Sequence, residues 1–179
     1  LLVRNMPDTG NHKQQHTVTL YPYRTDNRST DTENTYTVRL TTAAMLAKSG
    51  QDIHRVIIAT KVFDAEDAYN SIADNIAPDA WVGTVFNGLG VHENLAKRRP
   101  DIPLYAGVST DGALLTAPFT VTHTGIGQTV FGLYPSETHG ANSRTGDTWP
   151  FPTEFGLSTQ AVDNITPFLW QKCLINCAI

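Results

Sequence analysis

Cysteine, positive charge and long apolar runs are all scarce in this chain of 179 residues. The two cysteines, Cys173 and Cys177, cannot by themselves form a disulfide framework or a four-ligand zinc site. The chain has 13 Lys and Arg against 17 Asp and Glu, a net charge of −4, which argues against a nucleic-acid binder because such proteins present a basic surface. No apolar run approaches the roughly 20 residues that span a bilayer, so the sequence excludes a membrane-spanning helix.

Several common catalytic motifs are also missing. The chain contains neither a P-loop nor a G-x-G-x-x-G turn, and its acidic residues do not have metal-ligand spacing. It has no G-x-S-x-G elbow and no Cys–His pairing that would suggest a thiol nucleophile. We therefore expect no metal site and no serine or cysteine hydrolase.

Both ends of the sequence are unusual. The chain opens on LLVRNMPDTG without an initiator Met and lacks the charged and apolar regions of a signal peptide. It stops at LWQKCLINCAI, inside an apolar helical pattern with no Gly, Asn or Pro after it. We expect the middle part of a larger protein; the alternative is a natural short protein with unusual ends.

The first fifty residues are mostly polar. Residues 12–33 are rich in Thr, Asn and Asp and contain one strand-like segment, Val18–Tyr23. An alternating stretch, Tyr36–Leu40, predicts a second strand or hairpin partner, and Thr41–Ser49 predicts a short helix ended by Gly50. We expect the polar stretch to be a solvated insertion rather than a binding element.

The pattern of an α/β protein begins near residue 53. Val56–Thr60 predicts a strand buried on both faces, and Ala65–Ile76 predicts a helix with Asp64 as its N-cap. Trp81–Phe86 and Val91–Lys97 predict the next strand and helix. This alternating order indicates right-handed βαβ units and a parallel sheet.

The pattern changes after Pro100. Leu104–Ser109, Phe119–His123 and Thr129–Tyr134 predict short strands that add antiparallel pairing to the parallel sheet. The stretch Pro135–Pro152 predicts a surface loop, and a last helix is expected from about Thr166. The predicted fold class is therefore α/β, with a mostly parallel sheet and added antiparallel strands.

The last helix carries two polar residues on one face. Lys172 and Asn176 lie about 40° apart around a helix that is otherwise apolar on almost every side. Such a helix belongs in a protein interior, where a Lys and an Asn are costly unless a partner or a ligand binds them. The alternative is a Lys that extends to solvent and an Asn bonded to a neighbouring loop.

Three further residues follow predicted strands. Asn87 comes after WVGTVF with Gly88 and Gly90 beside it, at the kind of strand end where open α/β sheets bind ligands. Lys61 follows VIIAT, and Arg4 follows LLV; both suit the anionic groups of a nucleotide. The alternatives are an ordinary turn and two solvated surface charges.

The order of these motifs resembles ketopantoate reductase (2-dehydropantoate 2-reductase). The resemblance rests on VIIATKVFDAEDAYNSI, VFNGLGVHENL, AGVSTDGAL with FTVTHTGIGQTVFG, and LWQKCLINCAI. It implies a Rossmann-type domain followed by an all-helical domain, so that residues 1–160 would form an incomplete NADP-binding domain and residues 161–179 the start of the helical one. The polar stretch around residues 12–40 is not assigned to any part of the family pattern, and the family's G-x-G-x-x-G turn is absent.

The resemblance also implies an activity, the NADPH-dependent reduction of 2-dehydropantoate to (R)-pantoate in the pathway to pantothenate and coenzyme A. In this reading Lys172 is the catalytic acid, and Asn87 and Asn176 bind substrate. Arg4, Lys61, Asn87 and Ala113 contact NADPH, with Arg4 selecting the 2′-phosphate. The fragment alone is expected to be inactive.

The expected partner is a small-molecule substrate, with no nucleic acid or membrane. A homodimer is left open, and the expected location is the cytoplasm. Two alternatives remain: a reductase of another 2-oxo acid on the same fold, and a non-catalytic nucleotide-binding module.

Overall fold

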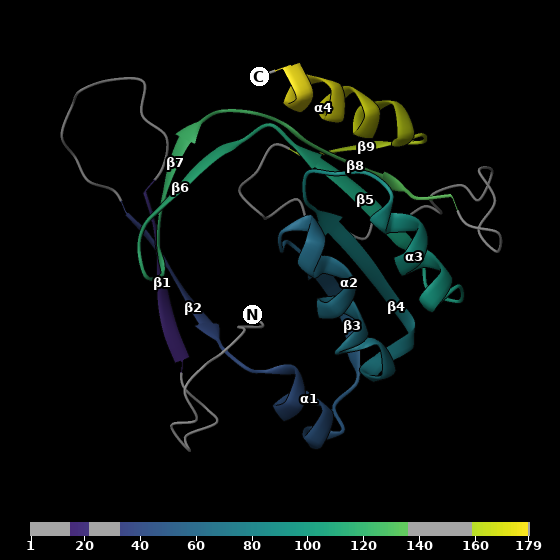
Figure 1. Cartoon of the computed structure of the whole chain (residues 1–179). Coiled ribbons are helices and arrows are strands. Elements are labelled where there is room, and N and C mark those ends of the chain that lie inside the picture. The colour runs from purple at the N-terminus through teal and green to yellow at the C-terminus, as the bar shows by residue number, and fades with distance from the viewer. Residues whose placement is uncertain (1–14, 22–32, 136–158, 179) are drawn as a thin grey trace. The chain divides into compact units, whose positions relative to one another are not determined.

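The computed structural model describes residues 15–21, 33–135 and 159–178. The chain divides into two compact units, each described by itself (Figure 1). One unit comprises residues 1–49 and 110–127, and the other comprises residues 50–109 and 128–179. Within the described ranges no helix is long and apolar enough to cross a membrane.

The first unit is built on a four-stranded sheet with the order β2-β1-β7-β6. Its elements are β1 (Gln15–Tyr21), β2 (Asn34–Arg39), α1 (Ala43–Ser49), β6 (Gly112–Ala117) and β7 (Thr120–Gly125). β1 and β2 pair antiparallel, which confirms the predicted strand and its hairpin partner, and the predicted helix ends at Gly50 with φ of +62°. The polar stretch is nevertheless more than an insertion, because β1 also pairs with β7 and so becomes an inner strand.

Asp111 contacts two residues of the segment His123–Gly127, which begins in β7. The carboxylate Oδ1 of Asp111 accepts the N–H of Gly127 at 3.0 Å and lies 3.4 Å from Nε2 of His123. A Cβ on Gly127 would come within 2.3 Å of the backbone of Thr110, so only glycine fits there. Within this unit the segment therefore has a structural role.

The second unit contains the predicted mostly parallel sheet, with the order β3-β4-β5-β8-β9. Its strands are β3 (Ile53–Ile58), β4 (Ile76–Val85), β5 (Leu104–Ser109), β8 (Thr129–Leu133) and β9 (Thr159–Val162). β3, β4 and β5 are parallel, and β8 runs antiparallel to β5, as expected. The strand predicted at Phe119–His123 is β7, which belongs to the other sheet.

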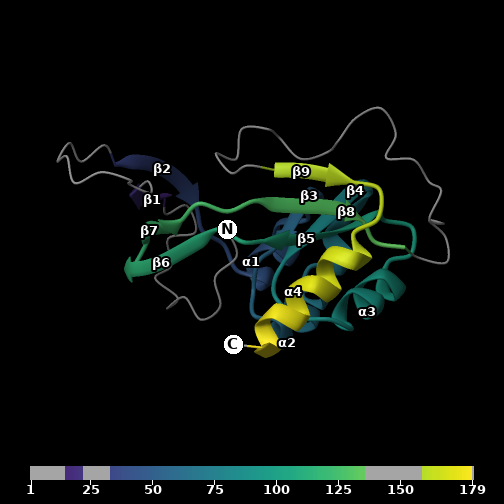
Figure 2. The ribbon, with the colours of Figure 1, turned by 90° about the horizontal axis from the view of Figure 1, so that it is seen from above.

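Three helices lie on one side of this sheet (Figure 2). They are α2 (Val62–Asn70), α3 (Val91–Arg98) and α4 (Thr166–Ala178). Beneath α4 a cluster of Ala106, Val130, Ile165 and Leu169 is almost completely buried. This packing confirms the predicted last helix and attaches it to β5 and β8.

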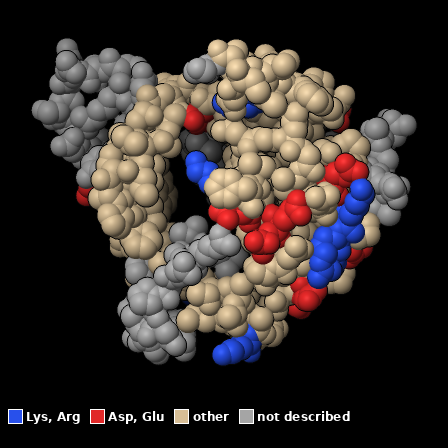
Figure 3. Space-filling view, viewed as in Figure 1, with Lys and Arg blue, Asp and Glu red and all other residues tan. Residues whose placement is uncertain are grey.

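Charged side chains of both signs cover the exposed surfaces of α2 and α3 (Figure 3). Lys97 pairs with Glu93 at 2.8 Å along α3, and Arg98 pairs with Asp74 at 2.9 Å. Pairs as exposed as these contribute little to stability, so this surface serves mainly as a solvated face.

The helix predicted at Ala65–Ile76 has different bounds in the structure. α2 begins at Val62 with Lys61 in the N-cap position, so Asp64 lies in the first turn and is not the cap. α2 ends at Asn70, and a turn of 3₁₀ helix η1 (Ala73–Asn75) leads directly into β4. β4 begins five residues earlier than predicted because Ile76 and Ala77 are already buried in the core.

The strand predicted at Val56–Thr60 is buried on only one face. Val56 and Ile58 are buried, but Ile57 between them is 40% exposed. β3 is the first strand of the described sheet, and α2 covers only one of its sides, so its apolar run alternates in burial.

Gly107 in β5 lies directly opposite Phe131 in β8. A Cβ at this position would lie 2.4 Å from Cε1 of Phe131 and 2.7 Å from the carbonyl oxygen of Thr84. We expect Gly107→Ala to lower the free energy of unfolding by about 2 kcal/mol, because the backbone oxygen cannot move aside. Urea unfolding should show this loss but little change for Gly125→Ala, whose added Cβ would have its nearest neighbour at 3.8 Å. Equal stabilities of the two variants would contradict the steric argument.

Candidate functional site

The carboxyl ends of the parallel strands bring two of the predicted residues to one edge of the sheet. Ile58 of β3 pairs with Thr84 of β4, and Lys61 and Asn87 each follow three residues later. Both side chains are exposed. Ligands of open α/β sheets bind at this edge, so the strand register supports a common site for the two residues.

The turn between β4 and α3 requires its glycines. Gly88 has φ of +138° and Gly90 has φ of +91°, conformations that other residues rarely adopt. A Cβ on Gly88 would also lie 2.9 Å from Cγ2 of Val62, because this turn packs against the start of α2. The Asn87–Gly90 turn is therefore held close to α2 by a contact that only glycine allows.

Both helices that start at this edge lack a side-chain cap. Lys61 precedes α2 and Gly90 precedes α3, and neither side chain caps the first N–H groups. Uncapped N–H groups and the positive end of a helix dipole favour an anion. With the ammonium group of Lys61, the edge has the donors that the phosphates or ribose of a nucleotide require.

α4 places Lys172 and Asn176 one turn apart on its surface. The helix is anchored at its start, where Oδ1 of Asn164 accepts the N–H of Thr166 at 3.1 Å and where Leu169 is buried. Lys172 is half-buried and Asn176 is exposed. In the described residues one side of α4 packs on the sheet, whereas Trp170 is 56% exposed and Leu174 is 66% exposed. The expectation of an interior helix stays a prediction about the larger protein.

The buried cluster beneath α4 also contacts the turn after β4. Leu89 is half-buried and packs against the cluster that contains Ile165 and Leu169. The same group of apolar side chains thus anchors both the Asn87–Gly90 turn and the beginning of the helix that carries Lys172. This is the physical link between the two sets of predicted residues.

Two other predicted residues do not belong to the described part of this unit. Arg4 lies outside the described residues. Ala113 is an exposed residue of β6, paired with His123 in the other unit.

Sequence reasoning did not identify His92, a buried residue in the first turn of α3. Its side chain is 1% exposed, and Nε2 lies 3.1 Å from Oγ1 of Thr84. Burial lowers its pKa to about 4, so the imidazole is neutral at physiological pH. One signal was available, because His92, Leu95 and Ala96 have the spacing of the buried side of a helix.

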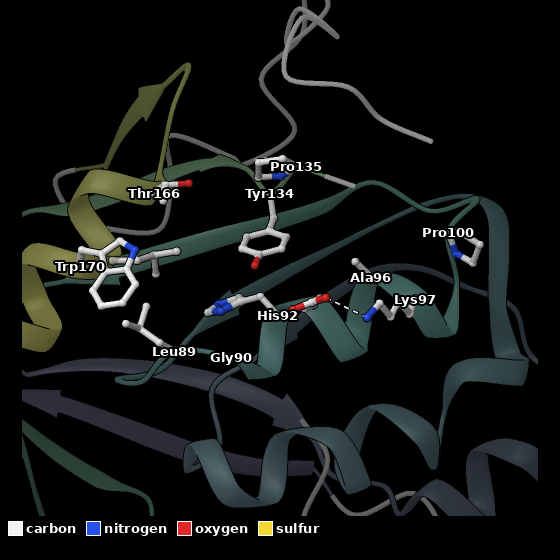
Figure 4. A pocket seen from close by; sticks show the side chains of 12 residues that line it. Leu89, Gly90, His92, Ala96, Lys97, Pro100, Tyr134, Pro135, Thr166 and Trp170 are labelled. Carbon is white, nitrogen blue, oxygen red and sulfur yellow. Dashed lines mark hydrogen bonds and ion pairs between the residues drawn. The ribbon is translucent and has the colours of Figure 1, made fainter. Parts of the chain in front are cut away.

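His92 also forms part of the wall of a cavity of about 760 Å³ between α3 and α4 (Figure 4). Leu89, Tyr134, Leu169 and Trp170 are among its other lining residues. Of the predicted site residues that the structure describes, none lines it, although Leu89 and Gly90 of the turn do.

Comparisons with known proteins show which proteins this chain is similar to. The family model described as ketopantoate reductase PanE/ApbA matches residues 12–136. A 2-dehydropantoate 2-reductase of Pyrococcus horikoshii is 33% identical over 144 residues, which cover 79% of this chain and 45% of that protein. One of Pyrococcus abyssi is 28% identical over 124 residues, which cover 69% of this chain and 39% of that protein. The chain therefore spans less than half the length of these relatives.

Solved structures show the same fold. The crystal structure of 2-dehydropantoate 2-reductase from Methylococcus capsulatus has a TM-score of 0.63 and 25% identity, with 90% of this chain and 49% of that chain covered. The structure of D-mandelate dehydrogenase with NADH and anilino(oxo)acetate has a TM-score of 0.64 at 20% identity, covering 89% of this chain and 47% of that chain. The α/β sheet with its added antiparallel strands is thus a Rossmann-like fold, and the chain belongs to the ketopantoate reductase family.

Proposed function

We propose that this chain carries part of an enzyme that reduces 2-dehydropantoate to (R)-pantoate with NADPH, a step toward pantothenate and coenzyme A. The observation that carries the proposal is the arrangement of Lys61, Asn87 and the glycine turn at the carboxyl edge, joined through the buried cluster to the helix of Lys172. Residues 1–160 would then be the nucleotide-binding part, and residues 161–179 the start of a helical domain.

Each predicted residue has a role that suits its chemistry. Lys172 donates a proton to the substrate carbonyl oxygen, and its positive charge stabilises the developing alkoxide. Asn176 and Asn87 hold the substrate through their side-chain amides, which can donate and accept hydrogen bonds. Asn176 lies in α4 one turn from Lys172, and Asn87 begins the glycine turn. Bound between the two amides, the substrate would present its carbonyl group to Lys172.

The residues of the edge fit the proposed nucleotide. Lys61 and the starts of α2 and α3, which no side chain caps, provide positive charge, and the backbone at Gly90 has open space beside it. Arg4 and Ala113 complete the proposed contacts. A bound reduced nicotinamide supplies the hydride that the carbonyl carbon receives.

Assay of the full-length gene product tests the proposal. NADPH oxidation should be faster with 2-dehydropantoate than with 2-oxoisovalerate or phenylglyoxylate at equal concentration. Faster reaction with one of the other acids would instead favour a reductase of another 2-oxo acid. No reaction with 2-dehydropantoate would contradict the proposal.

Arg4 is expected to determine the choice between NADPH and NADH. A bidentate guanidinium contact to the 2′-phosphate contributes roughly 2 kcal/mol, so Arg4→Ala should raise the Kd for NADPH by about 30-fold. The Kd for NADH should change by less than about 2-fold, since NADH has no 2′-phosphate. Titration of cofactor fluorescence measures both constants, and an equal loss for the two cofactors would remove Arg4 as the 2′-phosphate ligand.

A further inference from the structure

The side chain of His92 connects the two ends of the turn that carries Asn87. Its Nε2 lies 3.1 Å from Oγ1 of Thr84, near the end of β4, whereas His92 itself lies in the first turn of α3. All residues of the Asn87–Gly90 turn lie between these two bonded residues in the chain. The contact is buried, so water does not compete for it.

The hydroxyl of Thr84 has a second hydrogen-bond partner. The hydroxyl of Thr84 donates to the carbonyl oxygen of Tyr105 in β5 at 3.4 Å. The direction of the His92–Thr84 bond depends on the ring tautomer. When the one hydrogen of the Thr84 hydroxyl goes to Tyr105, Oγ1 accepts from His92, whose ring then carries its proton on Nε2. One short chain of hydrogen bonds thus joins α3 to β4 and then to β5.

Two aromatic rings fix the plane of the imidazole. Phe86 stacks on the ring of His92 with centroids 4.9 Å apart, and Tyr134 stacks on it at 5.2 Å. Figure 4 shows the side chain of Tyr134, the residue after β8, close to that of His92 on α3. Phe86 immediately precedes Asn87, so the stack acts directly on the residue that leads into the turn.

We propose that His92 is a positioning residue, which holds the Asn87–Gly90 turn in the conformation that presents Asn87 to the substrate. The role of Asn87 in this inference rests on the proposed function. The restraint of the turn rests on the contacts of His92 with Thr84, Phe86 and Tyr134. As a positioning residue, His92 does not contact the reacting atoms. It acts through Thr84 on one side of the turn and through Phe86 at its start.

A double-mutant cycle tests the route of action. His92→Phe keeps a ring between Phe86 and Tyr134 but cannot donate to Thr84. We expect it to lower kcat/KM for 2-dehydropantoate about 10-fold in the wild-type background and less than 2-fold in the Asn87→Ala background. A purely structural role would lower activity by the same factor in both backgrounds, and that outcome would overturn the proposal.

A second variant isolates the hydrogen bond from the ring. Thr84→Val removes the acceptor and leaves the imidazole between its two aromatic neighbours. It should reproduce the kinetic effect of His92→Phe, and the two changes combined should cost little more than either alone. Full additivity of the two changes would contradict a shared contact.

A readout without turnover separates this inference from the proposed function. In the 179-residue chain, backbone ¹⁵N order parameters of Gly88 and Gly90 should fall from about 0.85 to below about 0.6 in His92→Phe. His54→Phe is the matched control, because His54 is an exposed histidine of β3 that pairs with Asp79. Unchanged order parameters in His92→Phe would overturn the hold on the turn. The order parameters can fall in His92→Phe even though the wild-type gene product does not reduce 2-dehydropantoate. That result would contradict the proposed function but not the restraint of the turn by His92.

Discussion

Replacing Lys172 by alanine is expected to lower kcat of the full-length gene product by about 100-fold or more. The loss of a general acid costs roughly that factor, because the alkoxide that forms at the carbonyl oxygen then has no nearby proton or positive charge. The half-buried position of Lys172 on α4 supports this role, since a partly desolvated ammonium stabilises negative charge more strongly than one in water. KM should change much less than kcat, because the alkoxide exists only in the transition state.

Lys48→Ala is the matched control for this experiment. Lys48 is an exposed lysine in the last turn of α1, so its removal changes the net charge by the same amount without touching the proposed site. Steady-state rates of the two variants under saturating NADPH give the comparison. A Lys172→Ala enzyme that keeps the wild-type kcat would remove Lys172 from the mechanism.

Acidification from pH 7 to pH 4 is expected to destabilise the second unit through His92. Burial lowers the pKa of His92 from 6.5 to about 4, so the unfolded chain binds a proton in this range while the folded chain does not. The stability that the neutral imidazole contributes is fully present above pH 6.5 and is lost as the pH falls toward 4. At about 1.4 kcal/mol for each pH unit, the expected loss is about 3 kcal/mol.

Urea unfolding of wild type and His92→Phe at several pH values measures this effect. Other groups titrate over the same range, but their contributions cancel in the difference between the two proteins. The advantage of wild type over His92→Phe should decrease by about 3 kcal/mol between pH 7 and pH 4. A difference that does not vary with pH would mean that the folded chain protonates His92 as readily as the unfolded one.

The parts of the fold that were predictable are those set by short-range pattern. The alternation of strand and helix from β3 to β5 fixes the parallel sheet, and Gly50 marks the end of α1 as expected. The sequence did not predict β6. Its apolar residues Leu114 and Leu115 are exposed, so they do not alternate with polar residues, and no pattern within β6 indicates its pairing with β7. The one-sided burial of Ile57 likewise depends on the position of β3 in the sheet.

The candidate site shows the same division. Lys61 and Asn87 were placed correctly at the sheet edge because both directly follow parallel strands. The sequence did not predict a role for His92, because that role depends on the contacts of its ring with Thr84 and Tyr134. Tyr134 is distant from His92 in the sequence. The spacing of Lys172 and Asn176 could be read from the helical repeat, whereas the exposure of α4 could not, since it depends on what packs around the helix. The roles of these residues stay predictions until the variants are measured.

The close contact between Gly88 and Val62 limits how this turn can be redesigned. Gly88 and Gly90 are fixed by backbone conformation, and Asn87 by the chemistry proposed for it, so Leu89 is the one position of the turn where the side chain can vary. Its side chain packs against the cluster that anchors α4. A larger or smaller residue at position 89 would therefore shift the start of α4 relative to the turn. Position 89 therefore controls how far the proposed contacts on the turn lie from those on α4, although its own side chain belongs to neither set.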